Sequence, residues 1–269
     1  MTQQKENPYD AQIHVPTERN QLMARTLEAI NSNREVTTLW HVINVNAIER
    51  MGITDHGPVH FQIVANIALK LARLLIKHKI TMSVTEDYQL STDHAEVVIL
   101  LASLLHDLGM SINRTQHEEF SLFLTNTLLR ETLEFLPVIE RTIVISETLH
   151  AIISHRSDGQ PLTLEAGIVR VSDALDMSEG RSRIPYEAGE VNIHSISAAA
   201  IDDVEIQEGE DKPIQINILM NNSAGLFQID ELLKNKIFGS GLEPYLDVNA
   251  YIDRKTEKNL LKSFSIQGL

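Results

Sequence analysis

A histidine and an aspartate stand side by side at the end of the longest apolar run in the chain. The run Val97–Leu105 leads into His106-Asp107, and Gly109 follows two residues later. Apolar side chains carry such a segment into the core, so the imidazole and the carboxylate lie at its edge, where leaving them unpaired is costly. A divalent metal ion would satisfy both side chains at once. We therefore ask which other segments supply ligands.

A second histidine is predicted to face inward from the first turn of another helix. Pro58 suits the first turn, and apolar residues at helical spacing extend the predicted helix to about residue 79. His60 then lies on the same side as Val64 and Ile67, which face the core. His56 directly precedes this helix, where it could support a ligand, contact a substrate or have no role.

Two more histidines are predicted at helix ends. Thr115-Gln116-His117-Glu118 has the form of a capping box, which places His117 in the first turn of a helix that extends to about residue 129. Pro137 opens a further helix that ends at His155, directly before a turn rich in Ser, Asp, Gly and Pro. Both imidazoles are therefore expected at the mouth of the helical bundle.

A last carboxylate is expected on the helix predicted for residues 161–177. Asp173 lies between apolar residues and is predicted to point inward, whereas Asp176 is predicted to be exposed. Facing side chains of several helices commonly build metal sites in helical bundles. The candidate ligands are His60, His106, Asp107, His117, His155 and Asp173.

This set of nitrogen and oxygen ligands predicts a metal site that performs chemistry. The chain contains no cysteine, so thiolate ligands and disulfides are excluded. Imidazole and carboxylate suit Mn, Fe, Co, Ni or Mg better than a structural zinc. The set is larger than one ion needs and suits two ions, with Asp107 as the bridge. Two ions about 3.5–4 Å apart are a known arrangement for cleaving phosphate esters.

Composition limits the classes of partner. The 269 residues have a formal net charge of −14, so the chain lacks the basic excess that long nucleic acids require. A small phosphorylated ligand remains compatible, because local arginines and a bound cation override the global charge. The polar first 20 residues do not resemble a signal peptide, and the longest apolar run is too short to span a bilayer. We expect a cytoplasmic protein without membrane partners.

The element pattern predicts a mainly α protein with two domains. An N-terminal arm and helix occupy residues 1–35, and a helical metal-binding domain follows at 36–185. Alternating apolar residues then predict strands over 191–206, 214–220 and 246–252, with a helix over 223–237 between the last two. Residues 186–269 are therefore predicted to form a small α+β domain.

Residues 36–185 resemble the HD superfamily of metal-dependent phosphohydrolases. The resemblance rests on His60, the stretch Leu104-Leu105-His106-Asp107-Leu108-Gly109, and Asp173 within Val169–Leu175. It implies a helical HD domain in which these residues hold a metal. The two-metal branch has two further histidines, and His117 and His155 occupy matching places.

The sequence departs from the branch that cleaves cyclic dinucleotides. Ser154–Gly159 is similar to that branch, but Gln160-Pro161 replaces its Gly-Tyr-Pro signature and its paired His-His-Glu is missing. Met110 also stands where that branch usually has lysine. A cyclic dinucleotide is therefore not the expected substrate.

The expected function is hydrolysis of a small phosphate ester, such as a nucleotide, by a metal-activated hydroxide, with His106 and Asp107 at the catalytic centre. Arginine forks suit phosphate, so Arg114, Arg181, Arg183 and His56 are predicted to contact substrate. An HD-type di-iron oxygenase is one alternative, since that branch uses the same ligand set. A nucleotide-binding regulatory module is the other, with the C-terminal domain as a dimer surface or effector site.

Overall fold

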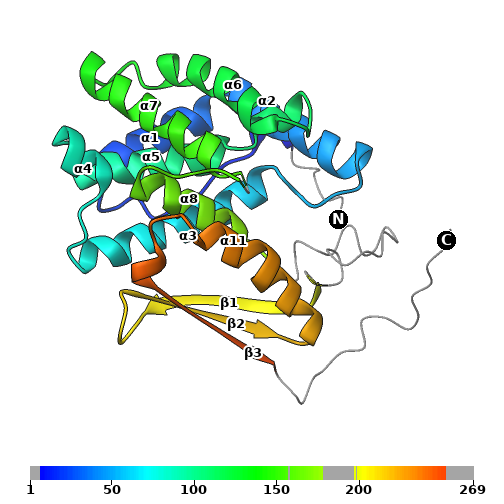
Figure 1. Ribbon diagram of the computed structural model, residues 1–269. Helices are drawn as coiled ribbons and strands as arrows, with labels where there is room; N and C mark the ends of the chain where they lie inside the picture. Colours follow the sequence, from blue (N-terminus) through cyan, green and yellow to red (C-terminus); the bar gives the residue numbers. More distant parts are fainter. Residues whose placement is uncertain (1–6, 157, 178–196, 198, 253–269) are drawn as a thin grey trace, which may run out of the picture.

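The computed structural model describes residues 7–156, 158–177, 197 and 199–252, and Figure 1 shows a helical body with a small sheet on one side. The helical elements are α1 (Gln21–Ser32), α2 (Arg34–Asn44), the π-helix Val45–Arg50, α3 (Pro58–Lys77), α4 (Ser83–Tyr88), α5 (Thr92–Leu105), the 3-10 turn Leu108–Ser111, α6 (His117–Thr132), α7 (Val138–Ser154) and α8 (Leu164–Leu175). The predicted mainly α fold is confirmed.

Helix α5 lies at the centre of the helical body. Every residue from Ala95 to Leu105 is buried, and α1, α3, α7 and α8 all pack against the helix. A helix that is apolar on all sides is stable only inside a protein. At its polar end, buried Glu96 pairs with Arg73 at 2.7 Å. The sequence signal of an unbroken apolar run thus marks the element around which the others pack.

Helix starts agree with the sequence prediction at α3 and disagree at α6. Pro58 occupies the first position of α3 as predicted. The predicted capping box is wrong, because α6 begins at His117 and its N-cap is Gln116 in the left-handed conformation (φ 63°). Thr115 therefore lies outside the helix and cannot cap it. His117 nevertheless stands in the first turn, as expected.

The C-terminal region forms a three-stranded sheet with helical segments. β1 (Ile201–Glu208) pairs antiparallel with β2 (Ile214–Met220), and β2 pairs parallel with β3 (Leu246–Ile252). Between β2 and β3 the chain forms the π-helix Gln228–Leu233 and α11 (Lys234–Ile237). α3 contacts β1 and β2, and α11 contacts α8 (Figure 1). The sheet therefore packs on the helical domain through α3, and α11 reaches the helix that carries Asp173.

The predicted α+β character of this region is confirmed, with one correction. The first strand begins at Ile201, and Ser197 and Ala199 are helical, so the prediction of strand across those positions was wrong. Residues 191–196 and the predicted domain boundary at 185/186 lie outside the described residues. The domain division therefore stays a prediction.

Among the residues that the structure describes, two segments are long and apolar enough to cross a membrane by length and composition alone. They are Pro58–Lys77 and Thr92–Ser111, and 50% and 89% of the apolar 18-residue window in each is buried within the fold. Core helices of soluble proteins pass the same test, and α5 is such a core helix here.

Candidate metal centre

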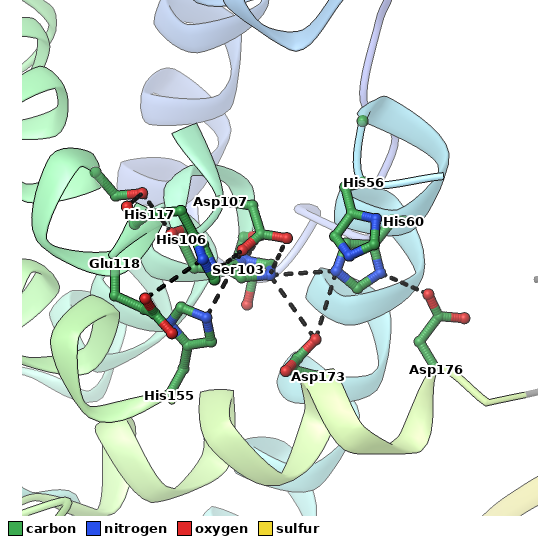
Figure 2. Close-up of polar contacts among 12 residues, drawn as sticks. His56, His60, Ser103, His106, Asp107, His117, Glu118, His155, Asp173 and Asp176 are labelled. Atoms are coloured by element: carbon green, nitrogen blue, oxygen red, sulfur yellow. Dashed lines mark hydrogen bonds and ion pairs between the residues drawn. The ribbon is translucent and has the colours of Figure 1, made fainter. Parts of the chain in front are cut away.

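The structure brings the predicted ligands together from five helices, and most of them stand at helix ends (Figure 2). A helix end can direct a side chain along the helix axis into a shared space, while the helix body packs the core. His60 lies in the first turn of α3, His106 and Asp107 follow α5, His117 opens α6, His155 follows α7, and Asp173 lies in the last turn of α8.

A change of backbone conformation lets His106 and Asp107 face the same centre. His106 keeps helical angles, whereas Asp107 has φ −101° and ψ 12° and leads into the following 3-10 turn. Consecutive residues of a regular α-helix point about 100° apart, which would separate the two side chains. Ending α5 at Leu105 removes this restriction.

Close packing fixes this turn against α6. A Cβ atom on Gly109 would lie 1.9 Å from the carbonyl oxygen of His117, so only glycine allows this approach. The Ser121 hydroxyl accepts a hydrogen bond from the Gly109 N–H at 2.8 Å and donates to the His106 carbonyl at 2.6 Å. The His-Asp pair and His117 are therefore held in one packed unit.

The Nδ1 atoms of His60 and His106 are both committed to acceptors. His106 Nδ1 donates to the Ser103 carbonyl at 3.0 Å, and His60 Nδ1 donates to the Asp176 carboxylate at 2.6 Å. In a neutral imidazole the other nitrogen then carries only a lone pair. The two Nε2 atoms lie 3.2 Å apart, so two lone pairs face each other. A cation between them relieves this repulsion.

His117 and His155 show the same arrangement. Their Nδ1 atoms donate to the carbonyl oxygens of Arg114 and Ile152, each three residues earlier in the chain. Both Nε2 atoms point toward Asp107 (Figure 2). Outer hydrogen bonds of this kind fix the tautomer and orientation of metal-binding histidines. All four imidazoles therefore present Nε2 to one centre.

The Asp107 carboxylate lies between two groups of donors. Its Oδ1 is 3.0 Å from His117 Nε2 and 3.7 Å from His155 Nε2, whereas its Oδ2 is 3.6 Å from His106 Nε2. His60 and His106 also face Asp173 Oδ1, at 3.5 and 3.8 Å. We call His60, His106 and Asp173 the inner cluster, and His117, Glu118 and His155 the outer cluster.

Each cluster could hold a divalent metal ion. The ligand atoms within a cluster all lie within 4.8 Å of one another, and His106, Asp107 and His155 form a third such group between the two. Glu118 Oε2 lies 3.3 Å from Nδ1 of His117, on the side of the ring away from Asp107. Donors that are all imidazole nitrogen or carboxylate oxygen fit the divalent ions predicted from the sequence.

The charge states of the centre favour cation binding. Burial lowers the pKa of His106, and burial with repulsion from His106 and Lys236 lowers that of His155 to about 3. Burial alone would raise the pKa of Asp107, but His106 and His117 outweigh it and hold the pKa well below its usual range. At neutral pH the centre therefore offers neutral His106 and His155 and an ionised Asp107.

His117 differs from its neighbours. Burial by itself would lower the pKa of His117, but the hydrogen bond to Asp107 and the carboxylate charge raise it to about 9. In the metal-free protein a proton on Nε2 therefore bonds to Asp107 where a metal ion would bind. Metal and proton compete for the same atom.

Sequence reasoning missed two residues that support the centre. The prediction that Asp176 is exposed was wrong, since Asp176 is 5% exposed and bonds to His60. It ends α8 with φ −77° and ψ 67°, so helical periodicity does not set its direction. Lys236 lies 3.2 Å from Asp173 Oδ2. Asp176 follows Asp173 by three residues, which is a local signal, whereas no local pattern marks Lys236.

The predicted substrate contacts have different placements. The His56 ring lies 5.7 Å from the His60 ring, and its charge lowers the pKa of Asp107. Arg114 is exposed in the bend before α6, and its carbonyl holds His117. Arg181 and Arg183 lie outside the described residues. The structure thus brings His56 to the centre and Arg114 to its edge.

Comparison with known proteins identifies the family. The HD domain family matches residues 59–178, the segment that contains every predicted metal ligand. This chain belongs to the HD domain family. It is also 40% identical over 235 residues to "Uncharacterized protein MJ1020" of Methanocaldococcus jannaschii, covering 87% of this chain and 90% of that protein. No solved structure shows a significant match. The HD domain is typical of metal-dependent phosphohydrolases, which indicates hydrolase-type chemistry that depends on a divalent metal.

Proposed function

We propose that this HD domain protein is a two-metal phosphohydrolase that cleaves a small phosphate ester, such as a nucleotide or a related phosphomonoester. The observation that carries the proposal is the position of Asp107. One carboxylate oxygen faces His117 and His155, and the other faces His106. A carboxylate placed between two sets of imidazoles is the arrangement expected of a ligand that bridges two ions.

The residues of the chain would have distinct tasks. His60, His106 and Asp173 would hold one ion, His117 and His155 the other, and Asp107 both. Divalent ions bound there would lower the pKa of a coordinated water and stabilise negative charge on phosphoryl oxygens. His56 and Arg114 stand beside the centre, and with Arg181 and Arg183 they are proposed to orient the phosphate.

Charge limits the class of substrate. A formal net charge of −14 disfavours long nucleic acids, while a small phosphorylated substrate stays compatible because local arginines and a bound cation override the global charge. A cytoplasmic location stays a proposal. The ions would be Mn, Fe, Co, Ni or Mg. Association of two copies through the C-terminal domain also stays a proposal.

Metal analysis combined with a substrate screen tests the function. The protein is purified, its metals are counted by elemental analysis, and the metal-free protein is reloaded with Mn²⁺, Co²⁺ or Mg²⁺ in anaerobic buffer. Release of inorganic phosphate from nucleotides and sugar phosphates is then measured. We expect about two ions per chain and phosphate release without oxygen.

Two results would replace this proposal by another. Stoichiometric iron with turnover that requires oxygen would indicate the oxygenase chemistry known for one branch of the superfamily. Nucleotide binding without turnover under any metal would indicate a regulatory module. His78→Ala serves as a control, since His78 lies at the surface and pairs with Glu208. This variant should match the wild-type protein in metal content and activity.

A further inference from the structure

A lysine of the C-terminal region reaches into the metal centre. Lys236 lies on α11, and its side chain is 14% exposed, whereas that of Lys234 on the same helix is 73% exposed. Lys236 Nζ lies 3.2 Å from Asp173 Oδ2 and donates to the main-chain carbonyl of His155. A buried ammonium group is costly unless it is paired and hydrogen-bonded. Both of these contacts are with residues of the metal centre.

The two carboxylate oxygens of Asp173 have different partners. Oδ1 faces His60 and His106 at 3.5 and 3.8 Å, and Oδ2 faces Lys236. A carboxylate held at one oxygen presents the other in a single orientation. The carbonyl contact with His155 adds a link to the outer cluster. Lys236 therefore touches one residue from each cluster, across α7 and α8.

Helix α8 holds the main chain around Lys236. Arg170, one turn before Asp173, donates to the carbonyl oxygens of Asn235 at 2.9 Å and of Lys236 at 3.0 Å. Nearer the start of α8, a Cβ atom on Gly167 would lie 2.0 Å from the carbonyl oxygen of Ser240, so the two main chains are in close contact there. The helix that carries Asp173 thus also binds the segment that carries Lys236. The fold therefore fixes the position of Lys236 relative to Asp173.

We propose that Lys236 is a positioning residue through which the C-terminal domain completes the metal centre. It orients Asp173 toward the inner ion and anchors the end of α7 at His155. The inference rests on the metal centre of the proposed function but does not depend on which reaction takes place there. A purely electrostatic role makes the opposite prediction, since removing a cation next to the site would tighten metal binding.

Cobalt titration of the full-length, metal-free protein distinguishes a positioning role of Lys236 from a purely electrostatic one. Affinity is measured by calorimetry, and ligand geometry is followed by the visible absorption of Co²⁺. Lys236→Met should weaken the tightest Co²⁺ site about 10–100-fold, as loss of an outer partner typically does, and should change the spectrum. Lys236→Arg should recover part of the affinity. Lys234→Met is the matched control and should bind and absorb like the wild-type protein.

Several results would overturn the inference. Lys236→Met that binds Co²⁺ as tightly as the wild-type protein or more tightly, with an unchanged spectrum, would show that Lys236 does not position Asp173. Circular dichroism during heating checks folding. If Lys236→Met does not fold, Lys236→Arg decides, because it keeps the charge but moves the donor atoms. Wild-type affinity and spectrum in that variant would overturn positioning.

The same titration separates this inference from the proposed reaction. Dependence of Co²⁺ binding on Lys236 without phosphate release from any substrate would refute the phosphohydrolase and leave the role of Lys236 intact. Wild-type protein that binds no Co²⁺ would overturn the metal centre itself, and the role of Lys236 with it.

Discussion

The inner and outer clusters use similar ligands in different surroundings. His60 and His106 are 1% and 0% exposed, and they stand at the ends of α3 and α5, which form the core. His117 is 19% exposed and opens α6 directly after the left-handed residue Gln116. His60 and His106 thus lie in the hydrophobic core and His117 at its margin, although Asp173 of the inner cluster is as exposed as His117 and His155 of the outer cluster is buried.

The outer partners of the ligands differ in the same way. In the inner cluster, charged groups hold two of the three ligands, since Asp176 bonds His60 and Lys236 contacts Asp173, whereas His106 is held by the Ser103 carbonyl. In the outer cluster, His117 is held by the carbonyl of exposed Arg114. A site whose ligands are already ordered loses less entropy when an ion binds. The comparison therefore predicts a tight inner ion and a more exchangeable outer one.

The largest expected effect comes from Asp107, which lies between the two clusters. Asp107→Ala should lose both ions and lower phosphate release by about 1,000-fold or more, which corresponds to about 4 kcal/mol of transition-state stabilisation. Elemental analysis and initial rates on the same sample measure both effects. Retention of both ions in this variant would show that Asp107 is not the bridge.

One histidine from each cluster tests whether the clusters are unequal. His117→Ala should keep the inner ion and lose the outer one. His60→Ala should lose the inner ion and also lower the free energy of unfolding by about 3 kcal/mol, because Asp176 becomes a buried carboxylate without its imidazole. Metal stoichiometry and thermal unfolding are measured for both variants, with His78→Ala as the control. Each variant is expected to lose one ion, so the distinction rests on stability. A free energy of unfolding that falls equally in the two variants at pH 9.5, above the His117 pKa of about 9, would refute it.

Much of the centre could be predicted from the sequence because its ligands stand where local signals are strong. The apolar run of α5 identifies His106 and Asp107 as residues at the edge of the core, and Pro58 fixes the start of α3 beside His60. His117 was placed correctly although the capping box was wrong. A one- or two-residue error in a helix start still leaves the residue in the first turn.

The outer partners could not be predicted for a physical reason. Asp176 lies past the last helical residue of α8, where a periodic pattern no longer specifies direction. Lys236 is 63 residues from Asp173 and reaches it because Arg170 bonds the main chain of α11 and Gly167 lets Ser240, just after α11, pack against α8. Local patterns find residues that the helices themselves orient. Contacts between distant segments depend on packing that no short stretch encodes.

Two carboxylates that contact a cluster histidine through its Nδ1 atom, Asp176 at His60 and Glu118 at His117, provide a finer comparison. Asp176→Asn keeps an acceptor for His60 but removes its charge, and we expect the inner ion to bind about 10-fold more weakly. Glu118→Gln should change affinity for the outer ion less than about 3-fold, because Glu118 lies on the Nδ1 side of His117 while the Arg114 carbonyl still holds the ring. Co²⁺ titration measures both affinities. A larger effect for Glu118→Gln would indicate that Glu118 is itself a ligand.

The last prediction is a pH dependence of the stability of the metal-free protein. Folding raises the pKa of His117 from 6.5 to about 9, so its pairing with Asp107 stabilises the fold fully below pH 6.5. This contribution, at most about 3 kcal/mol, is lost as the pH rises from 6.5 through 9. Chemical unfolding of the wild-type protein and His117→Ala in EDTA at pH 6 and pH 9.5 measures it, and the difference in free energy should shrink at the higher pH.

The buried histidines His106 and His155, one from each cluster, should respond with the opposite sign to His117. Burial lowers the pKa of His106, so the unfolded state binds a proton below pH 6.5 that the folded state does not. His106 therefore costs stability in acid, and this cost disappears above pH 6.5. A difference between the wild-type protein and His117→Ala that is constant from pH 6 to 9.5 would show that the outer cluster holds no such proton. Neither cluster would then have to lose a proton before a metal ion binds at neutral pH. Only the degree to which the ligands are held in place would make their metal affinities differ.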